Sequence, residues 1–324
     1  MRAALCGRAW PLVILDEAHN VKNVDSARHK LAADLRCDRI WQLTGTPMTN
    51  RPLDLWGLLV VGRHAMSADK IRYGMRYCRG HLGEHGWDFR GASNLPELSV
   101  KLSDWMLRRT KDEVLDLPPK IRATQRCTVP RALANATYSD IGAMMHGRSE
   151  LAAAKVGATL ERVEDVLEAE DKVIVFSESL AALDGLGKKL AHYGVVRIDG
   201  SVSPVARTAI VERFQSDPSI RVFLGQTRAA GVGITLTAAT SVIFNDLSLV
   251  PAYLAQAEDR AYRIGQNKRV SVVYMIADAA LDTACWEMLR EKLEIIGKFE
   301  SGLVDSDAAV ADGARRLLAA LQRA

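Results

Sequence analysis

Residues 10–23 read WPLVILDEAHNVKN, an apolar run that stops abruptly at two carboxylates. The run is short and contains two β-branched residues, so it predicts a buried strand with Asp16 and Glu17 at its carboxyl end. Carboxylates in that position can hold Mg²⁺ and orient or deprotonate a water molecule. Four letters are a weak signal alone, because two acids after a strand also fit a capped helix start.

Composition narrows the class of protein. The chain has 324 residues, enough for about two domains, and hydrophobic residues make up 48% of it. Its apolar runs are far shorter than the ~20 residues needed to cross a bilayer, and MRAALCGRAWPL is too short and polar for a secretory signal. Five scattered cysteines without a CxxC pair favour reduced thiols. We expect an intracellular protein, cytoplasmic or nucleoid-associated in a prokaryote or virus and nuclear in a eukaryote.

Charge is uneven along the chain. The net charge of +4 is too small to imply a polyanionic partner. Residues 1–130 hold 21 Lys and Arg against 14 Asp and Glu, whereas the rest holds 22 against 25. A basic N-terminal half fits a nucleic-acid partner, and it fits a solvated surface equally well.

Two segments alternate short apolar strands with amphipathic helices. The first runs from LVILDEAHN through SARHKLAADL to RIWQLTGTP, ending at residue 47. The second begins with KVIVFSES at residue 172 and continues through LAALDGLGKKLAHYG, VVRIDGS, RVFLGQT and SVIFNDL. This alternation predicts an α/β fold with parallel sheets covered on both faces, and ligands usually bind at the strand ends of such sheets.

The remaining segments insert into or join these sheets. Residues 52–110 have the composition of an inserted helical region, and DLPPK at 116–120 stops a helix. The segment ELAAAKVGATLERVEDVLEAED predicts an amphipathic connector. We therefore expect a first sheet region, a helical connector, a second sheet region and a tail, over residues 1–130, 131–170, 171–300 and 301–324.

LTGTP at 43–47 also follows an apolar strand. The hydroxyls of Thr44 and Thr46 flank a glycine there and can hydrogen-bond both to the acidic motif and to a moving neighbour. A tight turn is the simpler alternative.

QAEDRAYRIGQ at 256–266 is the most specific segment. Arg260 and Arg263 are three residues apart, so on a helix they project from one face and can reach phosphates. Arginines in this position neutralise charge that develops on a transferred phosphoryl group. Ion pairs with Glu258 and Asp259 are the structural alternative.

In their order along residues 10–300, these motifs resemble the Swi/Snf-type DNA-dependent ATPases of helicase superfamily two. DEAH, LTGTP, RRTKDEV with PPK, and RIGQ carry the resemblance. GWDFRGASNLPEL, the QAEDR form and LDTACWEMLREKLEIIG look most like the HARP-like annealing-helicase branch. The resemblance implies two RecA-like parallel-sheet lobes with helical insertions, ATP and Mg²⁺ as cofactors in the cleft, and double-stranded or forked DNA bound largely through its phosphates.

The resemblance also implies roles for individual residues of the first lobe. Asp16 would hold Mg²⁺ and Glu17 would activate the attacking water. His19, Thr44 and Thr46 would couple the nucleotide site to DNA.

In the second lobe, glycines would let the backbone approach the ligand closely. The residues that would complete the nucleotide site there are Gly231, Gly233, Gln256, Arg260 and Arg263. Three nearby residues depart from the commoner family pattern, namely Ala230, Thr235 and Tyr262.

The family's phosphate-binding loop, GxxxxGK[ST], would precede residue 10 and does not occur in the sequence. GLGKKL at 185–190 lacks its first glycine and its hydroxyl, and fits an amphipathic helix. We expect a first lobe truncated at its N-terminus, a loop supplied by a separate polypeptide, and little ATP turnover by this chain alone. Alternatives are a non-catalytic DNA-binding or regulatory module, a decayed gene fragment, or an RNA helicase of the same superfamily.

One competing site involves zinc. Cys78, His81 and His85 have a spacing that zinc tolerates, but no fourth ligand is evident. Local packing of the inserted region is the favoured interpretation.

Overall fold

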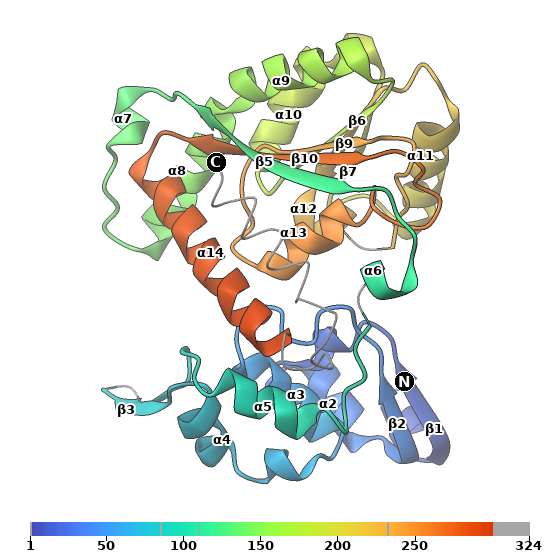
Figure 1. The fold of residues 1–324 in the computed structure, drawn as a ribbon, viewed down its shortest axis with the longest axis vertical. Coiled ribbons are helices and arrows are strands. Elements are labelled where there is room, and N and C mark those ends of the chain that lie inside the picture. The colour runs from blue at the N-terminus through green and yellow to red at the C-terminus, as the bar shows by residue number, and fades with distance from the viewer. Residues whose placement is uncertain (1, 85, 110, 232, 301–324) are drawn as a thin grey trace. The chain divides into compact units, whose positions relative to one another are not determined.

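The computed structural model divides into two compact units (Figure 1). The first contains residues 2–108 with 294–300, and the second contains residues 109–293. Helix α14, Ala280–Glu300, contributes residues to both. The residues that the structure describes are 2–84, 86–109, 111–231 and 233–300. The tail predicted at 301–324 lies outside them.

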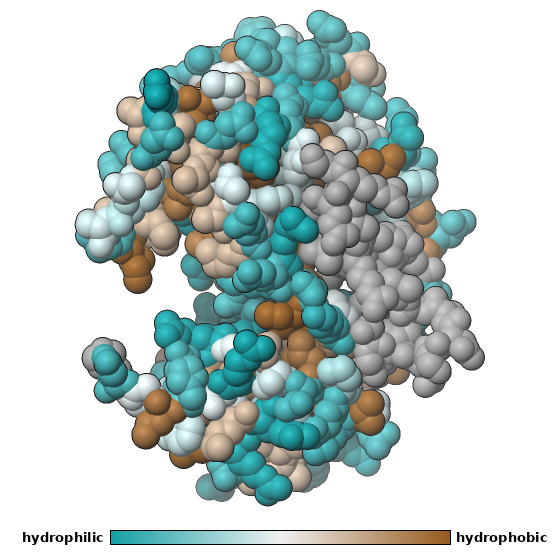
Figure 2. Space-filling model, turned by 60° about the vertical axis from the view of Figure 1, so that its left-hand side comes forward, coloured by the Kyte–Doolittle hydropathy of each residue, from teal (hydrophilic) through white to brown (hydrophobic). Residues whose placement is uncertain are grey.

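Surface and cysteine chemistry agree with the composition. Figure 2 shows scattered hydrophobic residues among hydrophilic ones on the visible face. All five cysteines are free, and four of them are buried. None of the described helices is both long and apolar enough to cross a bilayer.

The first unit begins with the predicted strand–helix–strand segment. Strands β1, Ala9–Leu15, and β2, Arg36–Gln42, pair in parallel with Leu15 opposite Gln42. The short helices α1, Arg2–Cys6, and η1, Ala18–Val21, flank β1, and α2, Ala27–Asp34, leads into β2. Ser26 caps α2, because its Oγ accepts a hydrogen bond from the backbone N–H of His29 at 3.1 Å. This arrangement confirms the alternation expected before residue 47.

One expectation about β1 is wrong. The sequence predicted a buried strand, but Leu12 and Ile14 are 36% and 52% exposed, and Trp41 on β2 is 54% exposed. Side chains alternate between the two faces of a strand. The face that carries Leu15 and Ile40 packs against a core of Ala18, Val21, Ala32, Leu58 and Val61. Among the described residues, no comparable core packs against Leu12, Ile14 and Trp41 on the opposite face.

The inserted region of the first unit is helical, as predicted, except for one hairpin. Its helices are α3, Leu53–Val61, η2, Ala65–Ala68, α4, Lys70–Tyr77, and α5, Leu95–Leu102. Between α4 and α5, β3, His81–Gly83, and β4, Gly86–Asp88, form an antiparallel hairpin that the sequence analysis missed.

The zinc alternative gains no support from the residues around this hairpin. Cys78 is fully buried, and burial raises the pKa of its thiol to about 12, whereas a zinc ligand is a thiolate. His81 is exposed, and His85 lies outside the described residues. Across the part of the chain that is described, no group of three potential metal ligands is found.

The second unit is built on a six-stranded parallel sheet, which confirms the predicted α/β fold class with RecA-like parallel sheets. Its strand order is β5-β10-β9-β6-β8-β7. The four strands β6, β7, β8 and β9 were predicted; they are Val173–Ser177, Val195–Ile198, Val222–Gln226 and Ser241–Phe244. The two that were missed, β5 and β10, are Lys120–Cys127 and Val270–Ala277. Strand β5 thus belongs to the second sheet, although the boundary expected near residue 130 assigned it to the first.

Helices cover both faces of this sheet (Figure 1). On one face α9, Val156–Ala169, and α10, Leu180–Lys189, pack against Val175, Leu224 and Ile243. Phe214 of α11, Pro204–Ser216, packs edge-on against Phe223 on the other face. The other helices are α6, Lys111–Val114, α7, Arg131–Ala134, α8, Ile141–Ala154, η3, Ala191–Tyr193, α12, Thr227–Ala230, and α13, Pro251–Glu258.

The predicted connector is two helices, α8 and α9, that meet at Lys155. This lysine is buried, and its Nζ donates to a carboxylate oxygen of Asp282 at 2.7 Å and to the carbonyl of Met275 at 3.1 Å. GLGKKL lies in α10, which confirms that it is a helix.

Candidate functional site

Residues 16–19, which we call the acidic turn, follow β1 directly. Asp16 is exposed and accepts a hydrogen bond from the backbone N–H of Glu17 at 2.8 Å. Glu17 has a φ of 48°, in the left-handed region that costs a residue with a Cβ about 1–2 kcal/mol. Its Oε2 lies 3.2 Å from Nδ1 of His19. Strain of this kind clusters at functional sites because it aims a side chain.

The backbone joins the acidic turn to LTGTP. The N–H of Leu43 donates to the carbonyl of Leu15 at 2.8 Å, and the N–H of Ala18 donates to the carbonyl of Leu43 at 2.9 Å. Two strand ends that are adjacent in the parallel pair thereby bring their motifs together.

Side chains complete this connection. Nδ1 of His19 lies 3.2 Å from Oγ1 of Thr44, which also accepts the N–H of Thr46 at 3.1 Å. Burial lowers the pKa of His19, and nearby Glu17 partly opposes the shift. Oγ1 of Thr46 is buried without a hydrogen-bond partner among the described residues. An unpaired buried hydroxyl is costly, so a further hydrogen-bond partner for this oxygen would be stabilising.

Residues 259–266, which we call the arginine turn, follow α13. The helix expected through Arg260 and Arg263 ends at Glu258, so the expectation of a helical arginine face is wrong. The chain turns there because the carbonyl of Arg260 accepts the N–H of Leu236 at 2.8 Å, and Gly265 takes a φ of 99°. Nη1 of each arginine nevertheless donates to the carbonyl of Ile234 at 3.1 Å. The two guanidinium groups therefore meet at one point.

The two glycines after α12 are required for different structural reasons. At Gly231 a Cβ would lie 2.6 Å from the carbonyl oxygen of Thr227, so packing alone requires glycine. Gly233 has a φ of 73° and open space around its missing Cβ, which leaves the backbone accessible. Gln256 is half-buried, and its carbonyl accepts from Nε of Arg260 at 2.9 Å.

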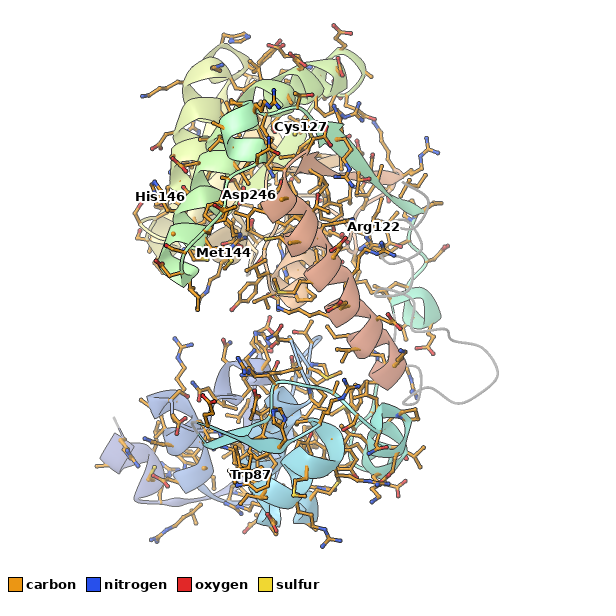
Figure 3. The ribbon with its side chains drawn as sticks, turned by 90° about the vertical axis from the view of Figure 1, so that its left-hand side faces the viewer. Trp87, Arg122, Cys127, Met144, His146 and Asp246 are labelled. Carbon is orange, nitrogen blue, oxygen red and sulfur yellow. The ribbon has the colours of Figure 1, made fainter. Side chains whose placement is uncertain are left out.

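A buried ion-pair network supports the arginine turn, and the sequence analysis missed it. Glu258 is fully buried and accepts from Nε of Arg122 at 2.9 Å and Nζ of Lys120 at 2.8 Å, both on β5. Arg122 is labelled in Figure 3. Its carboxylate also accepts the hydroxyl of Tyr274 on β10. Burial alone would raise the pKa of Glu258, but Arg122 and Lys120 hold it well below its usual range. The sequence signal for this network was Glu258, an acidic residue within an arginine-containing motif.

Gln266 fixes the other end of the turn. This residue is 5% exposed, and its Nε2 lies within hydrogen-bonding distance of three carbonyls, those of Thr237, Ala239 and Ala261. The arginine turn and the loop that contains Ile234 therefore form one rigid piece.

Residues 2–172 match the SNF2-related domain, and residues 158–265 match the helicase conserved C-terminal domain. The chain belongs to the SNF2-related family. This membership confirms the resemblance drawn from the motifs.

Individual relatives within this family share about a third of their residues with the chain. It is 36% identical to DNA annealing helicase and endonuclease ZRANB3 from Bos taurus, an alignment that covers 92% of this chain and 30% of the relative. It is 33% identical to SWI/SNF-related matrix-associated actin-dependent regulator of chromatin subfamily A-like protein 1 from Xenopus tropicalis, over 92% and 34%. The chain thus spans about a third of the length of these curated relatives.

A solved structure, the C-terminal part of the Fun30 ATPase domain, is also similar to part of the chain. The two are 27% identical over a match that covers 49% of this chain and 48% of the solved chain, with a TM-score of 0.40.

Taken separately, each of the two turns has side chains that suit one part of a magnesium nucleotide. Mg²⁺ bound to a nucleotide keeps several waters and needs only one or two carboxylates, so a full protein cage is not required. Asp16 offers an exposed carboxylate at a strand end, and among the described residues its Oδ2 has no hydrogen-bond partner. The paired arginines supply planar donors that suit phosphate oxygens.

Proposed function

We propose that this chain is part of an ATP-dependent translocase that moves on double-stranded or forked DNA. The observation that carries the proposal is the convergence of Arg260 and Arg263 on the carbonyl of Ile234, within a turn held rigid from both ends. Two fixed guanidinium groups suit a polyphosphate, and membership of the SNF2-related family supports ATP as that polyphosphate.

Each residue of the acidic turn has a role in this proposal. Asp16 holds Mg²⁺, which neutralises charge on the nucleotide phosphates when bound. Glu17 orients and deprotonates the attacking water, with its carboxylate aimed by the strained backbone. His19, Thr44 and Thr46 couple this chemistry to DNA, through the hydrogen bonds that join the two strand ends.

The second set of roles belongs to the second unit. Arg260 and Arg263 stabilise the charge of the transferred phosphoryl group, and Gln256 positions Arg260 through its carbonyl. Gly233, with open space around its missing Cβ, lets the backbone approach the ligand, and Gly231 lets the same loop pack closely on the carbonyl of Thr227. In this proposal both turns act on one nucleotide.

Turnover also needs a phosphate-binding loop, which the 324 residues do not contain. We infer that the loop comes from outside these residues and that the chain alone hydrolyses ATP slowly. The expected separate polypeptide is not supported by the comparisons, since the curated relatives are longer chains of which this one spans about a third.

The test is ATP hydrolysis with and without double-stranded DNA, by this chain alone and with a segment that supplies the phosphate loop. We expect DNA-stimulated hydrolysis only in the mixture. DNA binding should weaken steeply with salt and depend little on sequence. Robust hydrolysis by the chain alone would contradict the need for the loop, and none in the mixture would favour a non-catalytic DNA-binding module.

A further inference from the structure

The β3–β4 hairpin presents an exposed apolar face that the proposed motor roles do not use. Leu82 is 70% exposed and lies opposite Trp87, which is 41% exposed, so the two side chains share one face. The hairpin projects from the body of the first unit (Figure 1), and Trp87 is labelled in Figure 3. Isolated exposed apolar residues are ordinary, but a leucine and a tryptophan exposed side by side on a projecting hairpin are not.

Trp87 rests on a firm support. Its ring stacks on Phe89 with ring centres 5.8 Å apart and planes within 10°. Phe89 is 9% exposed and packs so closely on the backbone that a Cβ at Gly74 would lie 2.3 Å from its ring. The outer face of Trp87 is therefore a preformed flat surface, which loses little conformational entropy on binding.

Hydrogen bonds fix the base of the hairpin to the end of α4. Oγ of Ser93 donates to the carbonyl of Arg76 at 2.8 Å and accepts the N–H of Arg79 at 3.0 Å. The side chain of Asn94 also donates to the carbonyl of Arg76, at 2.8 Å. The hairpin is thus held at both of its ends.

Two arginines flank the hairpin at this base. Arg79 precedes β3 and is exposed, and Arg90 follows β4 with a side chain that is 80% exposed. Arg90 is oriented by Asp88, whose oxygens accept from its Nε at 2.9 and 3.0 Å. Residues 70–101 hold six Lys and Arg against three Asp and Glu, a net charge of +3 even with Glu84 and Glu97 counted. An apolar platform in a basic setting suits a nucleic acid better than an apolar protein surface.

We propose that Trp87 stacks against an unpaired base of single-stranded DNA at a fork, with Leu82 beside it and Arg79 and Arg90 near the phosphates. This inference rests on the proposed function and names the part of a forked substrate that the hairpin contacts. Bases in an intact duplex are stacked on one another and offer no free face, so duplex binding does not use the platform.

The test measures fluorescence anisotropy of three labelled DNAs with the full chain: a single strand of about 20 nucleotides, longer than a typical binding site, a blunt duplex, and a fork with unpaired arms. Trp87→Ala should weaken single-strand and fork binding by roughly 5- to 100-fold and leave duplex binding unchanged. Leu82→Ser should act in the same direction. Trp87→Phe should restore binding, because a flat ring remains.

Trp41→Ala is the matched control, since Trp41 is an exposed tryptophan of the same unit on β2 and should not matter for any of the three DNAs. If Trp87→Ala and Leu82→Ser change all three affinities equally or none of them, the hairpin serves another partner and the inference is overturned. Duplex binding by the unaltered chain would then still support the proposed function. If the unaltered chain binds no DNA, both proposals fail.

Discussion

The acidic turn and the arginine turn present their charges in different ways. In the acidic turn the strained backbone of Glu17 sets the direction of its carboxylate. This half-buried side chain lies beside His19, which contacts the hydroxyl of Thr44. The arginine turn is fixed at its two ends, by the buried carboxylate of Glu258 directly before it and by the buried amide of Gln266 at its last residue. In the proposed function, this difference would make the arginine turn a fixed receptor for phosphate charge, because its supports are buried, whereas the acidic turn depends on a strained backbone.

The largest predicted effect is a loss of ATP turnover when an arginine of the arginine turn is removed. Replacing Arg263 by alanine should lower kcat by roughly 10³- to 10⁵-fold, the range for an arginine that stabilises a transferred phosphoryl group. The free energy of unfolding should fall by only about 1 kcal/mol, because one hydrogen bond to Ile234 is lost. DNA-stimulated ATPase assays with the phosphate loop supplied, beside thermal unfolding, measure both. Arg269→Ala, an exposed arginine beyond the turn, is the control and should keep full activity.

The next effect removes the support of the arginine turn. Glu258→Ala leaves Arg122 and Lys120 largely buried without their carboxylate, so it should lower the free energy of unfolding of the second unit by about 3–5 kcal/mol. Asp259→Ala is the matched control. Its side chain is 32% exposed, and losing its ion pairs should cost about 0–1 kcal/mol. A denaturant titration that gives equal losses would refute the distinction between the two acids.

The smallest effect concerns the acidic turn and pH. Burial holds the pKa of His19 below its ordinary value of 6.5. Near and below pH 6.5 the histidine is therefore protonated in the unfolded chain while it stays neutral in the folded chain. Stability of the first unit should therefore be highest above pH 6.5, fall as the pH drops below it, and level off once the folded histidine is also protonated. Unfolding of His19→Gln measured over the same range should show a shallower decline, and an unchanged slope would count against this role.

Local sequence pattern predicted mainly apolar strands such as β6 and the motifs at their ends, although it missed β10, which is also mainly apolar. It missed β5, because KIRATQRC alternates charged and apolar residues and Arg122 becomes buried only through Glu258, 136 residues away. It extended α13 too far, since the turn at Arg260 depends on a hydrogen bond from Leu236. Contacts between residues far apart in the chain carry this information, and periodicity does not report them.

The most direct test of the account asks whether the two turns act on one nucleotide. DNA-stimulated ATP hydrolysis would be measured, with the phosphate loop supplied, for Glu17→Gln, Arg263→Ala and the double variant. If both side chains act on the same phosphoryl transfer, kcat of the double variant should be only slightly lower than kcat of the less active single variant. Losses that multiply in full, as they do for independent sites, would contradict the account.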